Sequence, residues 1–244
     1  MIPTPRQLKV ITFDLDDTLW HLKPILEKAE QHCFEWLCTQ HPSLLDHFNL
    51  ASFTAHRVKL YQQQPDLHHQ ISELRLQAMT SALKVTGLNT DDSKKLSHQA
   101  FARFIHERHQ VKLFNGVESL LETLAQHYQL GVLTNGNADI FRLDIGRYFE
   151  VSFSAEALNA SKPASDHFHA ALNHWGISTN ELLHIGDHID HDMRGAAEAG
   201  CFNLWFNPEA QVKPKHIEIS AEVSQLSDIP AAIDRLEQQL LSTK

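Results

Sequence analysis

The spacing of hydrophobic residues changes along the chain and divides it into three stretches. A short apolar run with β-branched residues at positions 10–13 is typical of a buried strand. From residue 24 to about residue 108, apolar residues instead recur at helical spacing in four successive segments, and no strand pattern is convincing. Because a stretch of this length is too long for a loop, we expect a small bundle of amphipathic helices.

Beyond about residue 112, strand-like and helix-like segments alternate. We expect strands in the short apolar runs at residues 130–133, 151–153, 182–185 and 202–206. We expect helices between and after them, including one at residues 140–149. Such alternation predicts a parallel sheet with helices on both faces. The predicted fold class is therefore α/β, with a Rossmann-like doubly wound core at residues 1–20 and 110–244 and an inserted helical domain at residues 21–109.

Composition narrows the classes of protein that fit this pattern. The 244 residues suit one large α/β domain or one domain that carries an insert. No stretch reaches the length of a membrane span, and the first seven residues lack a signal-peptide core, so we expect no membrane partner. Three cysteines do not form a disulfide framework, and their odd number fits a cytoplasmic location. The net charge of −9 argues against a general nucleic-acid binder.

The first predicted strand ends in an unusual group of acids, Asp14, Asp16 and Asp17. Packing does not favour carboxylates this close together, because like charges oppose each other's ionisation. A bound cation or a shared proton would relieve the repulsion, and both are common in phosphoryl transfer. The alternative is a solvated turn whose aspartates cap the next helix.

Polar residues also follow other predicted strands, namely Thr134, Lys162 and Asp187. Taken singly, each has an ordinary explanation: Thr134 as a helix cap, Lys162 as a solvated loop lysine, and Asp187 as a favourable charge at a helix N-terminus. Ligands of doubly wound sheets, however, bind at the carboxyl ends of the strands. The recurrence of such residues at successive strand ends therefore favours a functional site.

The first two acids suit the covalent and proton-transfer steps of phosphoryl transfer. Asp14 is the candidate nucleophile, since carboxylates form aspartyl-phosphate intermediates. Asp16 lies two residues further on, so in an extended segment its side chain returns to the same side as that of Asp14. We therefore expect Asp16 to act as general acid and then as the base that activates water.

The remaining polar residues suit the binding of Mg²⁺ and of the phosphate. A negative nucleophile that attacks a negative phosphate needs a hard cation with oxygen ligands. Asp187 would complete a magnesium site with Asp14, and Asp192 is close enough in sequence to contribute directly or through water. Thr134 offers a hydroxyl group to the phosphate, and Lys162 offers a charge that could hold both Asp14 and the phosphate.

Two further features have competing interpretations. His184, His188 and His191 flank Asp187, yet a separate zinc site is disfavoured because His184 lies inside an apolar strand run; His188 is a candidate to line the site. Trp20 stands where the first strand leaves for the helical stretch. It is either a stacking platform for a substrate ring or a packing residue between the domains.

Four short motifs resemble, in order, those of the haloacid dehalogenase-like hydrolase superfamily. They are Asp-Leu-Asp-Asp-Thr-Leu at 14–19, Leu-Thr-Asn-Gly-Asn at 133–137, Ser-Lys-Pro at 161–163 and Gly-Asp-His-Ile-Asp-His-Asp at 186–192. One motif alone is weakly specific, but four in order are strongly so. The resemblance implies a Rossmann-like core and a mobile helical cap that closes over the site.

The resemblance also implies roles for individual residues. Asp14 matches the nucleophile and Asp16 the acid/base, and the Asp16 backbone carbonyl joins the carboxylates on Mg²⁺. Thr134 matches the phosphate binder and Lys162 the motif lysine, while Asp187 falls on the metal with Asp192 nearby. We place Asn135 and Trp20 with Thr134 and Lys162 in the substrate-binding set.

Asp16 also separates subgroups of the superfamily. The true haloacid dehalogenases lack an aspartate at this position, so its presence favours a phosphatase. Within the phosphatases, the runs at 134–138, 148–150 and 16–20 are similar to those of bacterial enzymes acting on flavin mononucleotide or on a phosphorylated precursor of riboflavin. The alternative is a nucleotide or sugar-phosphate phosphatase. A haloacid dehalogenase and a non-catalytic protein that binds phosphate esters are less favoured.

Overall fold

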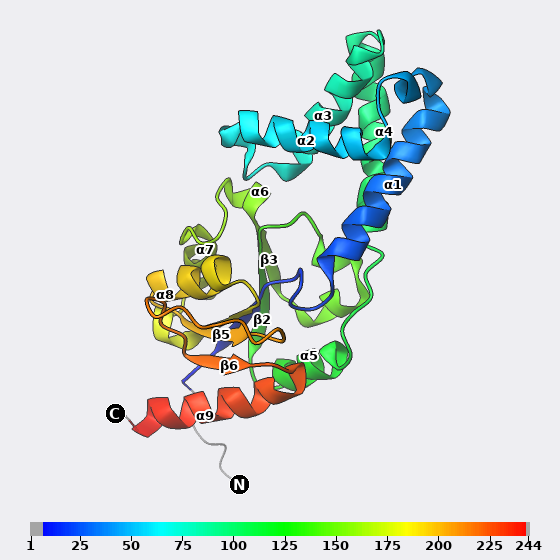
Figure 1. Ribbon diagram of the computed structural model, residues 1–244. Coiled ribbons are helices and arrows are strands. Elements are labelled where there is room, and N and C mark those ends of the chain that lie inside the picture. Colours follow the sequence, from blue (N-terminus) through cyan, green and yellow to red (C-terminus); the bar gives the residue numbers. More distant parts are fainter. Residues whose placement is uncertain (1–6, 243–244) are drawn as a thin grey trace. The chain divides into compact units, whose positions relative to one another are not determined.

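The structure, a computed structural model, describes residues 7–242, and these form two compact units (Figure 1). The first contains residues 7–20 and 113–242, and the second is the inserted segment His21–Lys112. We expected the insert to end at residue 109. The first unit resumes at Leu113 because this residue forms a β-bridge with Trp20, and the next amide, that of Phe114, donates to the Leu19 carbonyl at 2.9 Å.

The first unit is built on a six-stranded sheet in the order β3-β2-β1-β4-β5-β6, in which every neighbouring pair is parallel. The strands are β1 (Val10–Phe13), β2 (Gln129–Thr134), β3 (Val151–Ser154), β4 (Leu182–Gly186), β5 (Phe202–Phe206) and β6 (Ala221–Val223). All residues of β1 and β4 are buried, because both strands are central and covered on both faces. The predicted α/β Rossmann-like class is thereby confirmed.

Helices cover both faces of this sheet (Figure 1). On one side lie α5 (Val117–Ala125) and α9 (Ile229–Ser242), which pack against each other. On the other side lie α6 (Ala155–Leu158), α7 (Asp166–Trp175) and α8 (Gly195–Glu198). Hydrophobic residues spaced to one face of each longer helix account for this burial.

The helix expected at residues 140–149 is wrong. Two short 3₁₀ segments, Ile140–Arg142 and Asp144–Tyr148, replace it. Gly146 brings the backbone so close to the first segment that an added Cβ would lie 2.5 Å from the Ile140 carbonyl oxygen. This contact requires a fold-back that one continuous helix does not make.

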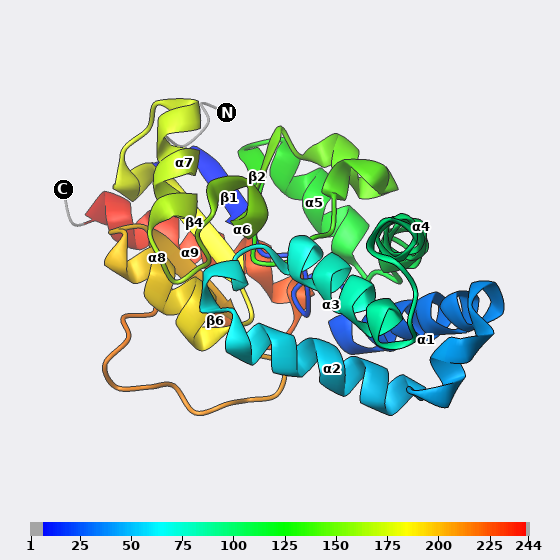
Figure 2. The same cartoon turned by 90° about the horizontal axis from the view of Figure 1, so that it is seen from above.

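The second unit consists of four helices, α1 (Leu22–Gln40), α2 (Leu50–Gln63), α3 (Ile71–Val85) and α4 (Thr90–Arg108). Short 3₁₀ segments at Pro42–Asp46 and Pro65–Leu67 connect them. In this unit α4 packs against α1 and α3, whereas α2 lies beside α3 and has no fully buried residue (Figure 2). The predicted helical composition of this stretch matches the structure. Among the described residues, no helix is both long and apolar enough to cross a membrane.

Candidate active site

The candidate site lies where the central strands β1, β2 and β4 end. Asp14 follows β1 directly, Thr134 is the last residue of β2, and Asp187 follows the last residue of β4. Because β1 pairs with both β2 and β4, these three positions fall side by side at one edge of the sheet. The order of the strands thus brings together the polar residues that the sequence places at successive strand ends.

Asp14, Asp187 and Asp192 form a carboxylate cluster in which one oxygen from each lies within 4.8 Å of the others. Burial, together with the neighbouring charges of Asp192 and Asp187, raises the pKa of Asp14 well above its ordinary value despite the opposing Lys162 charge. Burial and the Asp192 charge likewise raise the pKa of Asp187 to about 7. Three converging carboxylates fit a hard divalent cation such as Mg²⁺, which would remove this repulsion.

Lys162 is buried beside this cluster and contacts two of its members. Its Nζ donates to Asp14 Oδ1 at 2.8 Å, to Asp192 Oδ1 at 2.6 Å and to the Leu133 carbonyl at 2.5 Å. An ammonium group has three protons, so these acceptors use all of them. Burial alone would lower the lysine pKa, but the carboxylates of Asp14 and Asp192 raise it. Lys162 is therefore held charged at the centre of the site.

The Asn135 side chain forms two hydrogen bonds with the backbone of Lys162. Its amide accepts from the Lys162 backbone N–H at 2.8 Å and donates to the Lys162 carbonyl at 2.9 Å. This pair of bonds fixes the loop that carries Lys162. The amide is thus used to position the lysine, and contact of Asn135 with the substrate stays a prediction. Thr134 is buried, and its hydroxyl accepts the Gly136 N–H at 2.9 Å.

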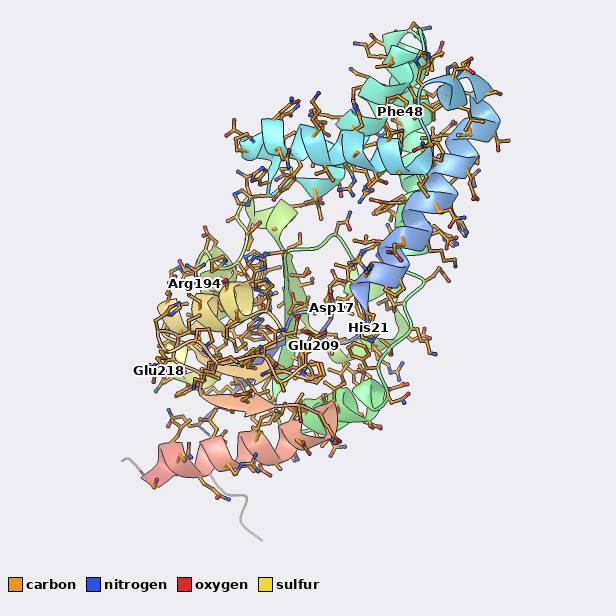
Figure 3. All side chains as sticks on the ribbon, viewed as in Figure 1. Asp17, His21, Phe48, Arg194, Glu209 and Glu218 are labelled. Atoms are coloured by element: carbon orange, nitrogen blue, oxygen red, sulfur yellow. The ribbon has the colours of Figure 1, made fainter. Side chains whose placement is uncertain are left out.

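The turn after β1 orients Asp16 through Trp20. The indole Nε1 donates to Asp16 Oδ1 at 2.9 Å, and the Asp17 amide donates to the Trp20 carbonyl at 2.7 Å. Asp17, labelled in Figure 3, is exposed and adopts a left-handed φ of 59° that closes the turn. Trp20 itself is fully buried. Its ring therefore packs in the interior and orients a carboxylate, which favours the packing alternative, while stacking on a substrate stays a prediction.

Two residues outside the predicted set hold Asp187 in place. The Thr18 hydroxyl donates to Asp187 Oδ1 at 3.1 Å, and Trp205 Nε1 donates to the Asp187 carbonyl at 2.8 Å. Gly186 precedes Asp187 and touches Asp192 so closely that an added Cβ would lie 2.3 Å from the Asp192 Cγ. Only glycine leaves room for the Asp192 carboxyl group here. The Gly-Asp pair of the motif thus has a steric basis.

His188 starts a π-helical segment, Ile189–Arg194, instead of pointing into a metal site. Its Nδ1 accepts the amides of Asp190 at 3.2 Å and His191 at 3.1 Å, and its ring stacks on that of His191 at 3.8 Å. Within the part of the chain that the structure describes, no group of three or more close metal-binding side chains includes a histidine. The zinc alternative receives no support from this arrangement.

His184 was missed as a functional residue because it lies in an apolar strand run. The structure buries it completely and places its Nε2 3.0 Å from Asp192 Oδ1. Burial opposes ionisation of Asp192, but the Lys162 charge and the His184 hydrogen bond outweigh this and hold the Asp192 pKa below its usual range. A polar residue inside an otherwise apolar central strand was the one signal that could have indicated this.

A parallel doubly wound sheet with buried acids and a lysine at its carboxyl edge defines the chain as a Rossmann-like hydrolase. The description "haloacid dehalogenase-like hydrolase" matches residues 8–200, and the chain belongs to this family. The family predicted from the four sequence motifs is thereby confirmed.

The chain is similar along nearly its whole length to individual proteins that are named phosphatases. It is 27% identical to 5-amino-6-(5-phospho-D-ribitylamino)uracil phosphatase YigB of Escherichia coli (strain K12), over 93% of this chain and 97% of that protein. It is 24% identical to glyceraldehyde 3-phosphate phosphatase of Pyrococcus furiosus, over 98% of this chain and 97% of that protein. The chain is accordingly a hydrolase of this family, and both of these relatives are named phosphatases.

A solved structure shares the fold over nearly the whole chain. The crystal structure of a 2-haloacid dehalogenase from Pseudomonas syringae pv. Tomato DC3000 superimposes with a TM-score of 0.88 at 36% identity, covering 93% of this chain and 99% of that one. That protein is named for the hydrolysis of a carbon–halogen bond, whereas the relatives above are named for the hydrolysis of a phosphate ester. Asp16, which is present here, is the position that separates the two activities in the resemblance described above.

Proposed function

We propose that the chain is a Mg²⁺-dependent phosphatase that hydrolyses a small-molecule phosphate monoester through an aspartyl-phosphate at Asp14. The observation that carries this proposal is the position of Lys162, whose ammonium group bridges the carboxylates of Asp14 and Asp192. The lysine neutralises part of the charge that would otherwise keep a phosphate away from the carboxylate cluster. Asp14, Asp187, Asp192 and the Asp16 carbonyl are the groups that would hold Mg²⁺.

In this proposal the residues of the chain divide the reaction between them. Asp14 attacks phosphorus while the ester oxygen leaves. Asp16, oriented by the Trp20 indole, gives that oxygen its proton and later takes one from the water that cleaves the aspartyl-phosphate. The Thr134 hydroxyl binds a phosphoryl oxygen, the charge of Lys162 attracts the phosphate, and Mg²⁺ would neutralise the charge of the phosphoryl oxygens as a Lewis acid.

The preferred substrate is 5-amino-6-(5-phospho-D-ribitylamino)uracil or flavin mononucleotide. Similarity to YigB along almost the whole of both chains supports this choice. The alternative is another nucleotide or a sugar phosphate, and the relative that acts on glyceraldehyde 3-phosphate supports that class. We further propose that the helical unit, His21–Lys112, is the cap that selects among these substrates.

A screen of phosphorylated metabolites tests the proposal. It should include flavin mononucleotide, the ribitylamino-uracil phosphate, nucleotides, sugar phosphates and an aryl phosphate, each with and without Mg²⁺. We expect phosphate release, with the highest kcat/KM for one of the first two. Tight binding of phosphate esters with no turnover anywhere in the panel would instead support a non-catalytic binding protein.

Haloacid hydrolysis is a second candidate, because the solved structure from Pseudomonas syringae has that name at 36% identity. The hydrogen bond from Trp20 keeps Asp16 in place as a proton donor, which a dehalogenase does not need. We therefore expect no halide release from 2-chloropropionate under conditions in which phosphate is released from an ester. Halide release without phosphatase activity would reverse this assignment.

We also propose a cytoplasmic location. Cys33, Cys38 and Cys201 are all free thiols, which fits a reducing compartment. A fluorescent fusion in fractionated cells would test the location directly.

A further inference from the structure

A buried chain of hydrogen bonds leads from the sheet to the carboxylate cluster. Thr12 on β1 and His184 on β4 are register partners in the parallel sheet, and both are fully buried. Thr12 Oγ1 lies 3.0 Å from His184 Nδ1, and His184 Nε2 lies 3.0 Å from Asp192 Oδ1. Polar side chains in two central strands cost stability unless their hydrogen bonds are made. Here each one is made, and the chain ends on a member of the cluster.

The chemistry of Asp192 sets the direction of its hydrogen bond with His184. An ionised Asp192 can only accept, so His184 Nε2 carries a proton. The other ring nitrogen, Nδ1, faces the Thr12 hydroxyl at 3.0 Å, and this contact orients the ring. The Nε2–H group is therefore aimed at Asp192.

Asp192 depends on this donor because its other partners cannot replace it. Its Oδ1 also accepts from Lys162 Nζ at 2.6 Å, and its Oδ2 accepts the His188 amide at 3.0 Å. Lys162 has no further proton to give, since it also donates to Asp14 and to the Leu133 carbonyl. If the His184 donor were lost, Asp192 would keep a buried lone pair without a partner, and only Lys162 and the His188 amide would still hold the carboxylate.

We propose that His184, oriented by Thr12, is a positioning residue that fixes the Asp192 carboxylate and thereby the metal-binding arrangement of the cluster. The proposal rests on the phosphatase function proposed above only in that Asp192 is assigned to the Mg²⁺ site. This role differs from simple packing. The rings of Phe168 and His184 form a T-shaped contact with 5.3 Å between their centroids, and any side chain of similar size could fill that space. What packing does not require is a hydrogen-bond donor at the position of Nε2.

Two substitutions separate these explanations. In His184→Gln the amide nitrogen falls near the position of Nε2, whereas in His184→Asn it falls near that of Nδ1. Both variants are polar and smaller than or similar to histidine, but only glutamine can still donate to Asp192. Thr12→Val and Thr12→Ser form a second pair, in which only serine retains the hydroxyl group that orients the ring.

The measurements are Mg²⁺ affinity by calorimetry without substrate, kcat and KM on an aryl phosphate, and the thermal midpoint. We expect His184→Asn to weaken Mg²⁺ binding roughly 10- to 100-fold, as removal of an outer-sphere partner commonly does, and to lower kcat more than it raises KM. His184→Gln should restore most of the affinity at a similar thermal midpoint. Thr12→Val should weaken binding less than His184→Asn, and Thr12→Ser should resemble the unmodified protein.

Equal Mg²⁺ affinities for His184→Gln and His184→Asn would overturn the proposal, and so would a lack of Mg²⁺ binding by the unmodified protein. If the His184 variants do not fold, equal affinities for the two Thr12 variants would overturn it instead. The calorimetric result does not depend on turnover. An unmodified protein that binds Mg²⁺ but hydrolyses no phosphate ester would refute the proposed function and leave the positioning role to be decided by these affinities.

Discussion

Among the described residues, a cluster of charged side chains that is largely buried in the first unit can be compared with one that is partly buried in the second, because the balance of acids and bases differs between them. In the first unit, three carboxylates lie together, one lysine contacts two of them, and burial raises the pKa of both Asp14 and Asp187. In the helical unit, one carboxylate, Glu30, is shared by two arginines, Arg57 at 2.6 Å and Arg75 at 2.9 Å. The first cluster has three acids and one base, so its negative charge is in excess. The second has one acid and two bases, so its single carboxylate is fully paired.

The second cluster is satisfied by its own side chains. Thr54 also donates to Glu30, Arg75 lies 3.7 Å from the centre of the Phe104 ring, and the two arginines lower the pKa of Glu30 although burial opposes them. Such a cluster stabilises a fold and needs no ligand. The carboxylate cluster is repulsive until a cation or a proton joins it, as is typical of functional sites. The comparison therefore separates charges that serve folding from charges that serve chemistry.

The largest effect that this comparison predicts is from Asp14→Asn. Removal of the nucleophile should lower kcat by roughly 10⁴- to 10⁶-fold, the range found when one member of a catalytic group is removed. The thermal midpoint should stay equal or rise, because one of three repelling acids is gone. Phosphate release assays and a thermal melt measure the two effects. Retained turnover would refute the assigned nucleophile, and a large fall in midpoint would refute the repulsion.

Removal of metal should have the next largest effect. EDTA should abolish phosphatase activity and added Mg²⁺ should restore it, since the carboxylate cluster would provide its ligands in the proposed function. Mg²⁺ at 100 times its dissociation constant should stabilise the folded protein by about 2.7 kcal/mol in a melt. Asp187→Asn is the matched variant and should lose this stabilisation. An equal stabilisation of Asp187→Asn would place the ion elsewhere.

The helical unit offers the converse experiment, Glu30→Gln. It leaves two partly buried arginines without their shared carboxylate, so we expect a loss of about 3 kcal/mol in the free energy of unfolding. Glu27→Gln is the control, because Glu27 is exposed and lies 3.9 Å from Lys23. That change should stay within about 0.5 kcal/mol. Similar denaturation midpoints for both variants would show that the Glu30 cluster does not stabilise the fold.

A smaller effect is expected from pH, through His167 on α7. Burial and the nearby Lys162 charge lower its pKa to about 4 from an ordinary 6.5, and its Nε2 lies 3.2 Å from the Thr134 carbonyl. Between these pH values the unfolded chain binds a proton that the folded chain does not. Stability contributed by this residue is therefore present above about pH 6.5 and is lost as the pH falls toward 4, by roughly 3 kcal/mol.

His167→Gln tests this pH effect, because glutamine can donate to the Thr134 carbonyl but does not titrate. Its free energy of unfolding should depend less steeply on pH in this window than that of the unmodified protein. His216→Gln, at an exposed position, is the control and should leave the slope unchanged. An unchanged slope in His167→Gln would contradict the expected pKa.

The smallest effect concerns the proton donor, through Trp20→Phe. Phenylalanine retains most of the buried ring but loses the N–H that donates to Asp16. We expect kcat to fall roughly 2- to 10-fold, the value of one hydrogen bond, with little change in KM. A large rise in KM with unchanged kcat would instead favour contact between Trp20 and the substrate.

Sequence reasoning located those residues well that are marked by the pattern of their immediate neighbours in the sequence. Central strands such as β1 and β4 are mostly apolar because both faces are covered, and a change from apolar to acidic residues marks their ends. β6 was not predicted because it has only three residues, of which Ala221 and Glu222 are not buried. Its place in the sheet comes from pairing with β5.

The parts that were missed depend on contacts between distant segments. Asn135 pairs with Lys162 across 27 positions, and Thr12 meets His184 across 172. No local pattern encodes such pairs, because strand order and register create them. The acids of the site were therefore predictable from their motifs, whereas the side chains that hold them were not.

The β-bridge between Trp20 and Leu113, with the bond from the Phe114 amide to the Leu19 carbonyl, has a consequence for how the gene can change. It brings the two ends of the insert together on the first unit's own backbone. The entropy of closing a loop rises only with the logarithm of its length. Segments of very different size can therefore replace residues 21–112 while the pairing of the strands in the sheet is kept. Recombination at this junction could exchange specificity while the catalytic edge is inherited intact.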